Sequence, residues 1–149
     1  MAGHTIRTIG VLTSGGDAPG MNAAIRAVVR TARSKGLHVR GIRRGYEGLM
    51  NEEIIRMDSG DVSDIIQRGG TILQTARCKK MMTEEGPRKA AAVCKKYDID
   101  GLVVIGGDGT FRGAQKIANY GVNTIGLPGT IDLDIACTEY TIGFDTAVN

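Results

Sequence analysis

The sequence predicts an α/β fold in which helices flank a parallel sheet, a Rossmann-like three-layer sandwich. The main observation is that short apolar runs alternate with amphipathic helical segments along the chain, which is typical of parallel strands joined by right-handed crossovers. In addition, the run at 102–105 is apolar at every position, as expected for a strand that helices cover on both faces. With 149 residues, 42% of them hydrophobic, the chain is large enough to bury such a core in one domain.

In the first half of the chain, glycines punctuate the predicted elements. The pattern predicts strands at 9–13 and 37–42, helices at 21–34 and 63–70, and a loop, RRGYEGLM, between the second strand and the second helix. Gly36 ends the first of these helices, and the paired Gly69 and Gly70 end the second. The order strand, helix, strand, helix fits the predicted sandwich.

The second half continues the same alternation. The pattern predicts helices at 83–96 and 110–120 and strands at 102–105 and 123–128. The helix at 83–96 has Glu84 and Glu85 in its first turn and Lys95 and Lys96 in its last turn, which suits the helix dipole. Gly121 ends the last of the predicted helices.

Composition excludes several classes of protein. The net charge is only +3 and aromatic residues make up 4%, unlike the basic, aromatic-rich surfaces that bind nucleic acid. Three widely spaced cysteines form neither a zinc motif nor a disulfide framework. No apolar run reaches transmembrane length, and the N-terminus lacks the core of a signal peptide. We therefore expect a protein of the reducing cytoplasm that binds neither nucleic acid nor membrane.

Two strand-to-turn segments share the residues GGD. TSGGDAPG follows the first strand, and GGDGT follows the strand at 102–105. Ligands of α/β sheets bind beyond the carboxyl ends of the strands, where glycines let backbone N–H groups approach phosphate. A carboxylate there would repel phosphate unless Mg²⁺ bridges the two, so Asp108 is a candidate metal ligand. A single GGD turn is equally consistent with a plain tight turn, but two at one sheet edge favour a phosphate site.

Other acidic and basic residues could complete such a site. In PGTIDLDIACTEY, Asp132 and Asp134 alternate, so an extended backbone would point both carboxylates the same way. Such a pair could supply a general base and a supporting charge, although the pattern alone slightly favours a solvated acidic loop. Arg77, which follows another glycine pair, could clamp a phosphate or be solvated.

Taken together, these motifs are specific enough to resemble a known family. The segments IGVLTSGGDAPGMNAAIR, GYEGL, RGGTIL, ARC, VVIGGDGT and PGTID, followed by TEYTIGFDTAVN, are similar to the N-terminal half of the ATP-dependent 6-phosphofructokinases, the phosphofructokinase A family. The resemblance runs from about residue 9 to residue 149. GGDGT alone also occurs in NAD kinases and diacylglycerol kinases, but its combination with the flanking motifs is specific.

The resemblance implies a reaction and a set of site residues. The family transfers the γ-phosphoryl group of MgATP to the 1-hydroxyl of fructose 6-phosphate. Nucleotide contacts are implied for Gly16, Tyr46, Arg77, Cys78, Gly107, Asp108, Gly109 and Thr110, with Asp108 serving Mg²⁺. Sugar-phosphate contacts are implied for Thr130, Ile131 and Asp132. Asp132 would be the general base, with Arg77, Thr130 and Asp134 as further catalytic residues.

Two glycines bear on the choice of phosphoryl donor. The pyrophosphate-dependent relatives carry Asp directly after GGD and Lys directly before TID. Here Gly109 and Gly129 occupy those positions. An Asp would fill the channel of the ATP phosphates, so the resemblance implies ATP as donor.

The chain also departs from the family. Leu133 replaces an Asn between the two aspartates, and Ser59 stands where an Arg is expected in the allosteric site. The remaining allosteric residues implied by the resemblance are Arg26, Arg30, Ser63 and Asp64.

The family's sugar-phosphate half is missing from these 149 residues. We expect 1–149 to be the nucleotide-binding domain of a longer protein that forms a homotetramer, with the isolated part inactive. Two alternatives stay open: a non-catalytic nucleotide-binding fragment, and a GGDGT-type kinase of another substrate such as NAD.

Overall fold

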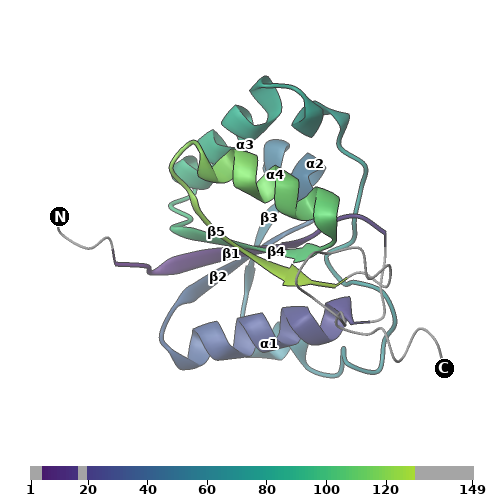
Figure 1. Cartoon of the computed structure of the whole chain (residues 1–149). Coiled ribbons are helices and arrows are strands. Elements are labelled where there is room, and N and C mark those ends of the chain that lie inside the picture. Colours follow the sequence, from purple (N-terminus) through teal and green to yellow (C-terminus); the bar gives the residue numbers. More distant parts are fainter. Residues whose placement is uncertain (1–4, 17–19, 130–149) are drawn as a thin grey trace.

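The computed structural model describes residues 5–16 and 20–129, in which helices and strands alternate (Figure 1). The strands are β1 (Thr8–Thr13), β2 (His38–Ile42), β3 (Ile54–Met57), β4 (Gly101–Gly106) and β5 (Asn123–Pro128). The α-helices are α1 (Met21–Ser34), α2 (Gly45–Met50), α3 (Glu85–Lys96) and α4 (Asp108–Ala118), and the 3₁₀-helices are η1 (Ser59–Val62) and η2 (Lys79–Met82).

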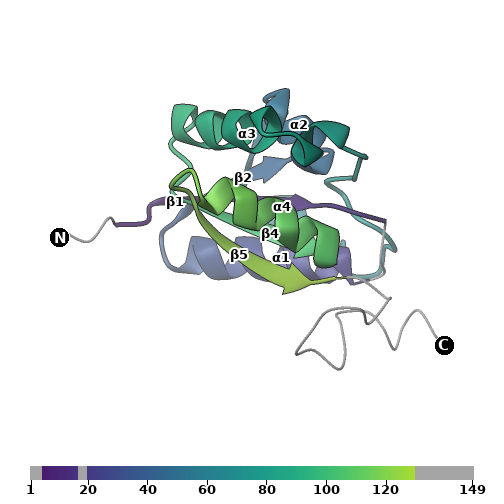
Figure 2. The same ribbon diagram turned by 45° about the horizontal axis from the view of Figure 1, so that its top comes forward.

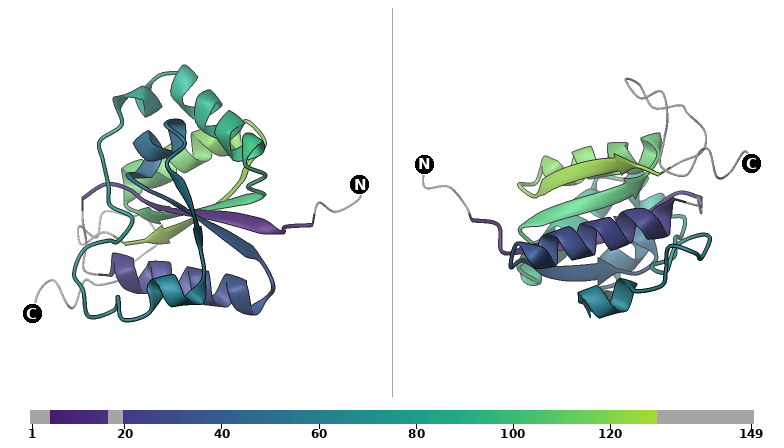
Figure 3. Two further views of the ribbon diagram at one scale, coloured as in Figure 1. Left: turned by 180° about the vertical axis from the view of Figure 1, so that it is seen from behind. Right: turned by 90° about the horizontal axis from the view of Figure 1, so that it is seen from below.

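The strands form one five-stranded sheet in the order β3-β2-β1-β4-β5. β1 pairs in parallel with both β2 and β4, and β4 pairs in parallel with β5. α1 covers one face of the sheet, and α2, α3 and α4 cover the other (Figures 1 and 3). Figure 2 brings the edge strand β5 forward, with α4 beside it. The predicted α/β sandwich is confirmed.

One strand departs from the parallel arrangement. β3 pairs antiparallel with β2 at the edge of the sheet, with Val39 opposite Met57 and Ile42 opposite Ile54. It is only four residues long. Such a segment is too short to show a periodic pattern, and for this reason the sequence did not predict it.

Alternate residues of the central strands enter two different cores. On β1, Val11 packs against α1, whereas Leu12 packs on the side of α2, α3 and α4. On β4, Ile105 joins the first core, and Leu102 and Val104 join the second. Because both faces of β4 are covered, this strand is apolar at successive positions.

Two predicted elements are wrong. Residues 63–70 form turns instead of a helix, since the segment offers only two adjacent apolar residues, of which Ile65 is buried and Ile66 is 53% exposed. The loop expected around Tyr46 is the helix α2. Two of its six residues are glycines, which disfavour helix. Burial of Tyr46, Leu49 and Met50 against the sheet outweighs that propensity.

The predicted helix boundaries are otherwise close to the observed ones. α1 has the predicted bounds. α3 begins at Glu85 instead of Thr83, and α4 begins at Asp108 instead of Thr110. The earlier start of α4 places Asp108 in the first turn of that helix. No helix in the described ranges is long and apolar enough to span a membrane.

Candidate functional site

The site is an open cleft at the carboxyl ends of β1 and β4. The parallel register pairs Thr13 with Ile105, and the N–H of Ser14 donates to the Ile105 carbonyl at 3.0 Å. The two glycine turns therefore start side by side. Both contribute to a cleft of about 1020 Å³.

The backbones of the two turns approach each other closely. Gly15 has φ +86°, a left-handed conformation that favours glycine. A Cβ at Gly106 would lie 2.4 Å from the hydroxyl oxygen of Thr110 and 2.6 Å from the carbonyl oxygen of Ser14. A side chain at Gly106 would force the turns apart, and a side chain at Gly15 would be strained by its backbone conformation, so the geometry favours glycine at both positions.

The N-terminus of α4 opens into this cleft. Gly107 is the N-cap residue with an extended backbone, and no side chain caps the helix. The first turn of a helix has N–H groups without intrahelical acceptors and carries the positive end of the helix dipole. Since Gly107 and Asp108 line the cleft, this helix end is suited to bind a phosphate.

A third wall of the cleft is the loop 63–78, which two buried polar side chains hold in place. The first is Thr13, the last residue of β1, which is fully buried. Its hydroxyl donates to the carbonyl of Gln74 at 3.0 Å and lies 2.9 Å from the hydroxyl of Thr71, which then acts as the donor. The strand that carries the first glycine turn thus also fixes this loop.

The second anchor is Asn22 in the first turn of α1, which is 1% exposed. Its side-chain amide donates to the carbonyl of Arg68 at 3.2 Å, and its side-chain oxygen accepts from the N–H of Ile72 at 2.7 Å. Buried polar groups are costly unless they are paired. Here both ends of the amide are satisfied, and the loop that leads to Arg77 and Cys78 is positioned without regular secondary structure.

Tyr46 supports α4 from α2. It is 4% exposed, and its hydroxyl donates to the carbonyl of Thr110 in the first turn of α4. Burial raises the pKa of the Tyr46 phenol well above its usual value, so the group stays protonated and acts as a donor. A Cβ at Gly113 would lie 2.8 Å from the Tyr46 ring. The glycine lets the ring pack directly on the helix.

The cysteine of the cleft is a neutral thiol. Cys78 is half-buried and lines the cleft, and burial raises the pKa of its thiol above the usual value. Cys94 lies in the core between the sheet and α3, where burial raises its pKa to about 12. Reactive cysteines have lowered pKa values. Cys78 is therefore suited to contact a ligand and not to attack one.

Charged residues of α4 face the cleft with helical spacing. Asp108, Arg112 and Lys116 are four residues apart, so they lie on one face of the helix, and all line the cleft. An Nη of Arg112 lies 2.6 Å from a carboxylate oxygen of Asp108, and Lys116 donates to the carbonyl of Met81 at 3.3 Å. With Arg77 and Lys79, the cleft carries more positive than negative side chains, which favours a polyanionic ligand.

A metal at this site would have few protein ligands. Within the described ranges, no group of three or more His, Cys, Asp and Glu side chains comes together. Asp108 is a single carboxylate beside a backbone phosphate cradle. That donor set fits Mg²⁺, which binds one or two carboxylates and completes its shell with phosphate oxygens and water.

The structure brings together every nucleotide residue that the resemblance implied. Gly16, Tyr46, Arg77, Cys78, Gly107, Asp108, Gly109 and Thr110 all line the cleft. The implied sugar and catalytic residues Thr130, Ile131, Asp132 and Asp134 lie outside the described residues. Gly129, which precedes them, is buried, and its N–H donates to the carbonyl of Gly106 at 2.9 Å. The chain therefore leaves β5 next to the second glycine turn.

Comparison with known proteins identifies the family. A profile described as phosphofructokinase matches residues 8–149. The chain belongs to the phosphofructokinase family. An ATP-dependent 6-phosphofructokinase from Clostridium botulinum is 69% identical over 144 residues, which cover 97% of this chain and 45% of that protein. The chain thus spans about half the length of the curated relatives it matches.

Solved phosphofructokinases share the fold. The enzyme from Saccharomyces cerevisiae superposes with a TM-score of 0.86 at 38% identity, covering 95% of this chain and 22% of the yeast chain. A pyrophosphate-dependent phosphofructokinase from Marinobacter aquaeolei gives a TM-score of 0.81 at 25% identity, covering 93% of this chain and 37% of that one. The predicted resemblance to a phosphofructokinase N-terminal half is confirmed.

A second, shallower hollow lies on the α1 side of this phosphofructokinase domain. It has a volume of about 520 Å³ and is lined by Arg30, Arg33, Ser34, Asp58, Ser59 and Gly60. Of the residues expected in an allosteric site, Arg30 lines this hollow together with Ser59. Arg26, Ser63 and Asp64 are not among its lining residues.

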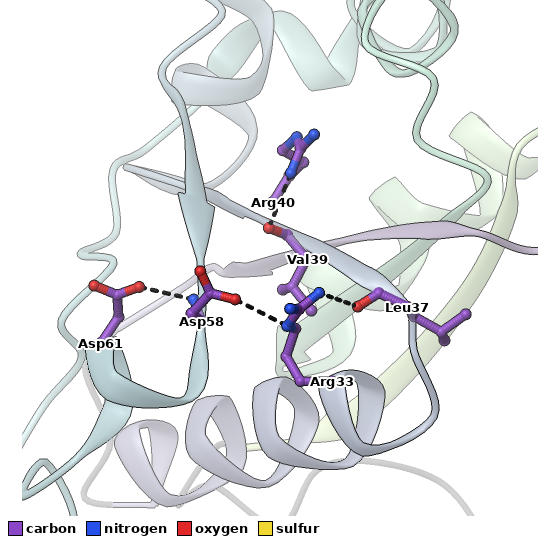
Figure 4. A network of polar contacts seen from close by, with 6 residues as sticks. All are labelled: Arg33, Leu37, Val39, Arg40, Asp58 and Asp61. Carbon is purple, nitrogen blue, oxygen red and sulfur yellow. Dashed lines mark hydrogen bonds and ion pairs between the residues drawn. The ribbon is translucent and has the colours of Figure 1, made fainter.

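Two residues that line the hollow form an ion pair that the sequence did not predict. Figure 4 shows Arg33 between Asp58, at 2.9 Å, and the carbonyl of Leu37, at 3.0 Å. The N–H of Asp58 in turn donates to the carboxylate of Asp61 at 2.7 Å. Arg33 already has an anionic partner here, whereas Arg30 makes no ion pair with any described residue.

The anchoring role of Asn22 can be tested directly. Asn22→Ala leaves the Ile72 N–H and the Arg68 carbonyl without their partner, which costs about 1–3 kcal/mol when the groups stay buried. We expect amide hydrogen exchange of residues 68–78 to accelerate while that of β4 changes little. Ser34→Ala, at the exposed end of the same helix, is the control and should leave the loop protected. Unchanged exchange in Asn22→Ala would show that other contacts hold the loop.

Proposed function

We propose that this chain is the nucleotide-binding part of an ATP-dependent 6-phosphofructokinase of glycolysis. The whole enzyme transfers the γ-phosphoryl group of MgATP to the 1-hydroxyl of fructose 6-phosphate and forms fructose 1,6-bisphosphate. The observation that carries the proposal is the convergence of two glycine turns, an uncapped helix N-terminus and an excess of cationic side chains in one cleft. The similarity to the ATP-dependent 6-phosphofructokinase of Clostridium botulinum supports the same activity.

Different cleft residues contact different parts of the nucleotide. Backbone N–H groups at Gly16 and at 107–110 bind the phosphates, and Arg77 contacts the phosphoryl group that is transferred. Asp108 would hold Mg²⁺, which would neutralise part of the phosphate charge. Tyr46 and Cys78 contact the nucleotide. Phosphoryl transfer relies mainly on positioning and charge neutralisation, which such a site supplies.

The acceptor side is assigned to residues beyond Gly129. Thr130, Ile131 and Asp132 contact the sugar phosphate, and Asp132 takes the proton of the 1-hydroxyl as general base, supported by Asp134. The hydrogen bond from Gly129 to Gly106 supports this assignment because it brings the start of that segment next to the phosphate cradle.

Assembly, location and regulation complete the proposal. The whole enzyme is a cytoplasmic homotetramer that uses ATP and fructose 6-phosphate. An effector binds near the second hollow through Arg26, Arg30, Ser63 and Asp64. Regulation is weakened because Ser59 replaces a cationic side chain, and Arg33 does not compensate because Asp58 neutralises it.

Metal-dependent nucleotide binding tests the proposed cleft. We expect the chain to bind ADP more tightly with Mg²⁺ than with a chelator. Asp108→Ala should weaken binding of MgADP about tenfold, or 1.4 kcal/mol, because the carboxylate that would hold the metal is removed. Isothermal titration calorimetry measures both affinities. Asp61→Ala, which removes a carboxylate outside the cleft, should bind like the wild type. Equal affinities with and without Mg²⁺ in the wild type would contradict the metal role.

Donor choice is tested at Gly109. A Cβ at Gly109 would meet no atom within 4 Å, whereas a Cβ at Gly129 would lie 2.8 Å from a methyl group of Ile105. Gly109→Asp therefore adds a carboxylate to the cleft without disturbing the core, but Gly129→Lys would require repacking. In the full-length enzyme, kcat/KM should be higher with ATP than with pyrophosphate.

We expect Gly109→Asp to lower kcat/KM for ATP at least about tenfold, because its carboxylate repels the phosphates. Gly109→Ala, which adds volume without charge, should cost much less. An equal loss in both variants would attribute the effect to volume instead of charge.

The general base is tested in the full-length enzyme with Asp132→Asn, which keeps the size of the side chain but not its basicity. The kcat should fall by about 10²–10⁴, while MgADP affinity stays close to the wild-type value. Asp134→Asn should cost less, because it acts through Asp132. Leu133→Asn, which restores the family residue, should keep the activity. If Asp132→Asn retained most of its kcat, the base would have to be Asp134 or another group.

A further inference from the structure

The residue proposed to hold Mg²⁺ already has a cationic partner in this structure. Arg112 lies one helical turn after Asp108 on α4, and its Nη2 is 2.6 Å from Oδ2 of the aspartate. Both side chains line the cleft. A metal bound to this carboxylate would weaken such a contact, since two cations held by one carboxylate lie close enough to repel each other. Arg112 and Mg²⁺ therefore compete for Asp108.

We propose that Arg112 is a positioning residue that neutralises the Asp108 carboxylate when no metal is bound. In this way Arg112 sets how strongly nucleotide binding depends on Mg²⁺. This inference rests on the proposed function, in which a nucleotide occupies the cleft and Mg²⁺ binds Asp108. When the metal is absent, Arg112 neutralises the carboxylate beside the phosphate cradle. When the metal binds, Arg112 leaves the carboxylate.

The first argument is electrostatic. Without a countercharge, Asp108 would place a negative charge in the first turn of α4, where the helix end and the glycine turns are suited to bind phosphate. A like charge there weakens phosphate binding. The ion pair with Arg112 removes much of that repulsion, so the cleft can accept a nucleotide before the metal arrives.

The second argument is that the pair is weak enough to be exchanged. The Arg112 side chain is 75% exposed and that of Asp108 is 41% exposed, so water competes for both charges. Exposed ion pairs of this kind shift equilibria by about fivefold or less. Among the described residues, Arg112 makes no other hydrogen bond or ion pair. A divalent cation at Asp108 would therefore displace it at low cost.

Lys116, the next charged residue along α4, lines the cleft but does not contact Asp108. Lys116 lies one further turn along α4 and also lines the cleft, but its amine donates to the Met81 carbonyl at 3.3 Å. It adds positive charge to the cleft without touching Asp108. Removing Lys116 should weaken phosphate binding to the same degree with and without metal, which makes it a matched control for Arg112.

The experiment is isothermal titration calorimetry of the 149-residue chain with ADP, once with Mg²⁺ and once with a chelator. The measured quantity is the ratio of the Kd in chelator to the Kd in Mg²⁺. In Arg112→Gln we expect this ratio to rise about twofold to fivefold. The Kd in chelator should rise because the Asp108 carboxylate, without its countercharge, repels the phosphates. The Kd in Mg²⁺ should fall because the metal no longer has to displace Arg112. Arg112→Lys should stay near the wild-type ratio, and Lys116→Gln should leave it unchanged.

A double variant separates a direct role from a general charge effect. In the Asp108→Asn background, adding Arg112→Gln should not change the ratio, because the partner is gone. Far-ultraviolet circular dichroism checks that each variant is folded. We expect the Arg112 variants to fold because this side chain is exposed. An unchanged or lowered ratio in Arg112→Gln, with the wild-type ratio well above one, would overturn the inference and leave the metal site intact. A wild-type ratio of one would instead overturn the proposed metal role, and the inference with it.

Discussion

The parallel pairing of β1 with β4 is the constraint on which the rest of the site depends. It places Thr13 opposite Ile105, so two turns that are about 90 residues apart in the sequence begin at the same edge of the sheet. The hydrogen bond from the Ser14 N–H to the Ile105 carbonyl extends the pairing one residue beyond the strand. Without this register, neither glycine turn would have a partner, and the N-terminus of α4 would open onto solvent alone.

The same strand also determines where the loop 63–78 lies. That loop has no regular secondary structure, yet it carries Arg77 and Cys78 to the cleft. Thr13 and Asn22 hold it through hydrogen bonds to backbone groups of the loop and to the Thr71 hydroxyl. In the described part of the chain, no buried side-chain nitrogen or oxygen lacks a partner. Buried polar groups in this phosphofructokinase domain therefore specify a loop position that apolar packing alone would leave open.

Local patterns predicted the parts of the fold whose causes are local. Four strands and three long helices follow from apolar runs, helical spacing and glycine stops, and the two GGD turns located the cleft. The helix α2 and the strand β3 were missed because each is short and owes its conformation to tertiary contacts. The helix α2 packs against α3, and β3 pairs with β2. The expected helix at 63–70 did not form because the segment has only two adjacent apolar residues, and Asn22 fixes its end by donating to the Arg68 carbonyl.

The residues of the candidate site also fall into those that the sequence could predict and those that it could not. The motif residues that line the cleft were predicted because the resemblance depends on them. Arg112 and Lys116 could have been found, since they lie four residues apart on the helix predicted at 110–120, and Asp108 lies four residues before Arg112. Asn22 could not, because its partners lie 46 and 50 residues away and a lone Asn at a helix start predicts nothing about them. Arg33 was missed because its pairing with Asp58 depends on the packing of η1 against α1.

Burial separates the parts of the cleft that are fixed from the parts that can adjust. Thr13 and Asn22 lie beneath it at 0% and 1% exposure, and each makes two hydrogen bonds that would cost free energy to break without water as a substitute. Asp108 and Arg112 line the cleft and are exposed, so water can replace either partner. A ligand that brings its own charges, such as a nucleotide with a divalent cation, can therefore rearrange the side chains at the surface while the backbone cradle beneath stays in place. Preorganised backbone donors combined with exchangeable surface charges are what a phosphoryl-transfer site needs, because the charge of the bound phosphates changes with the metal and during the reaction.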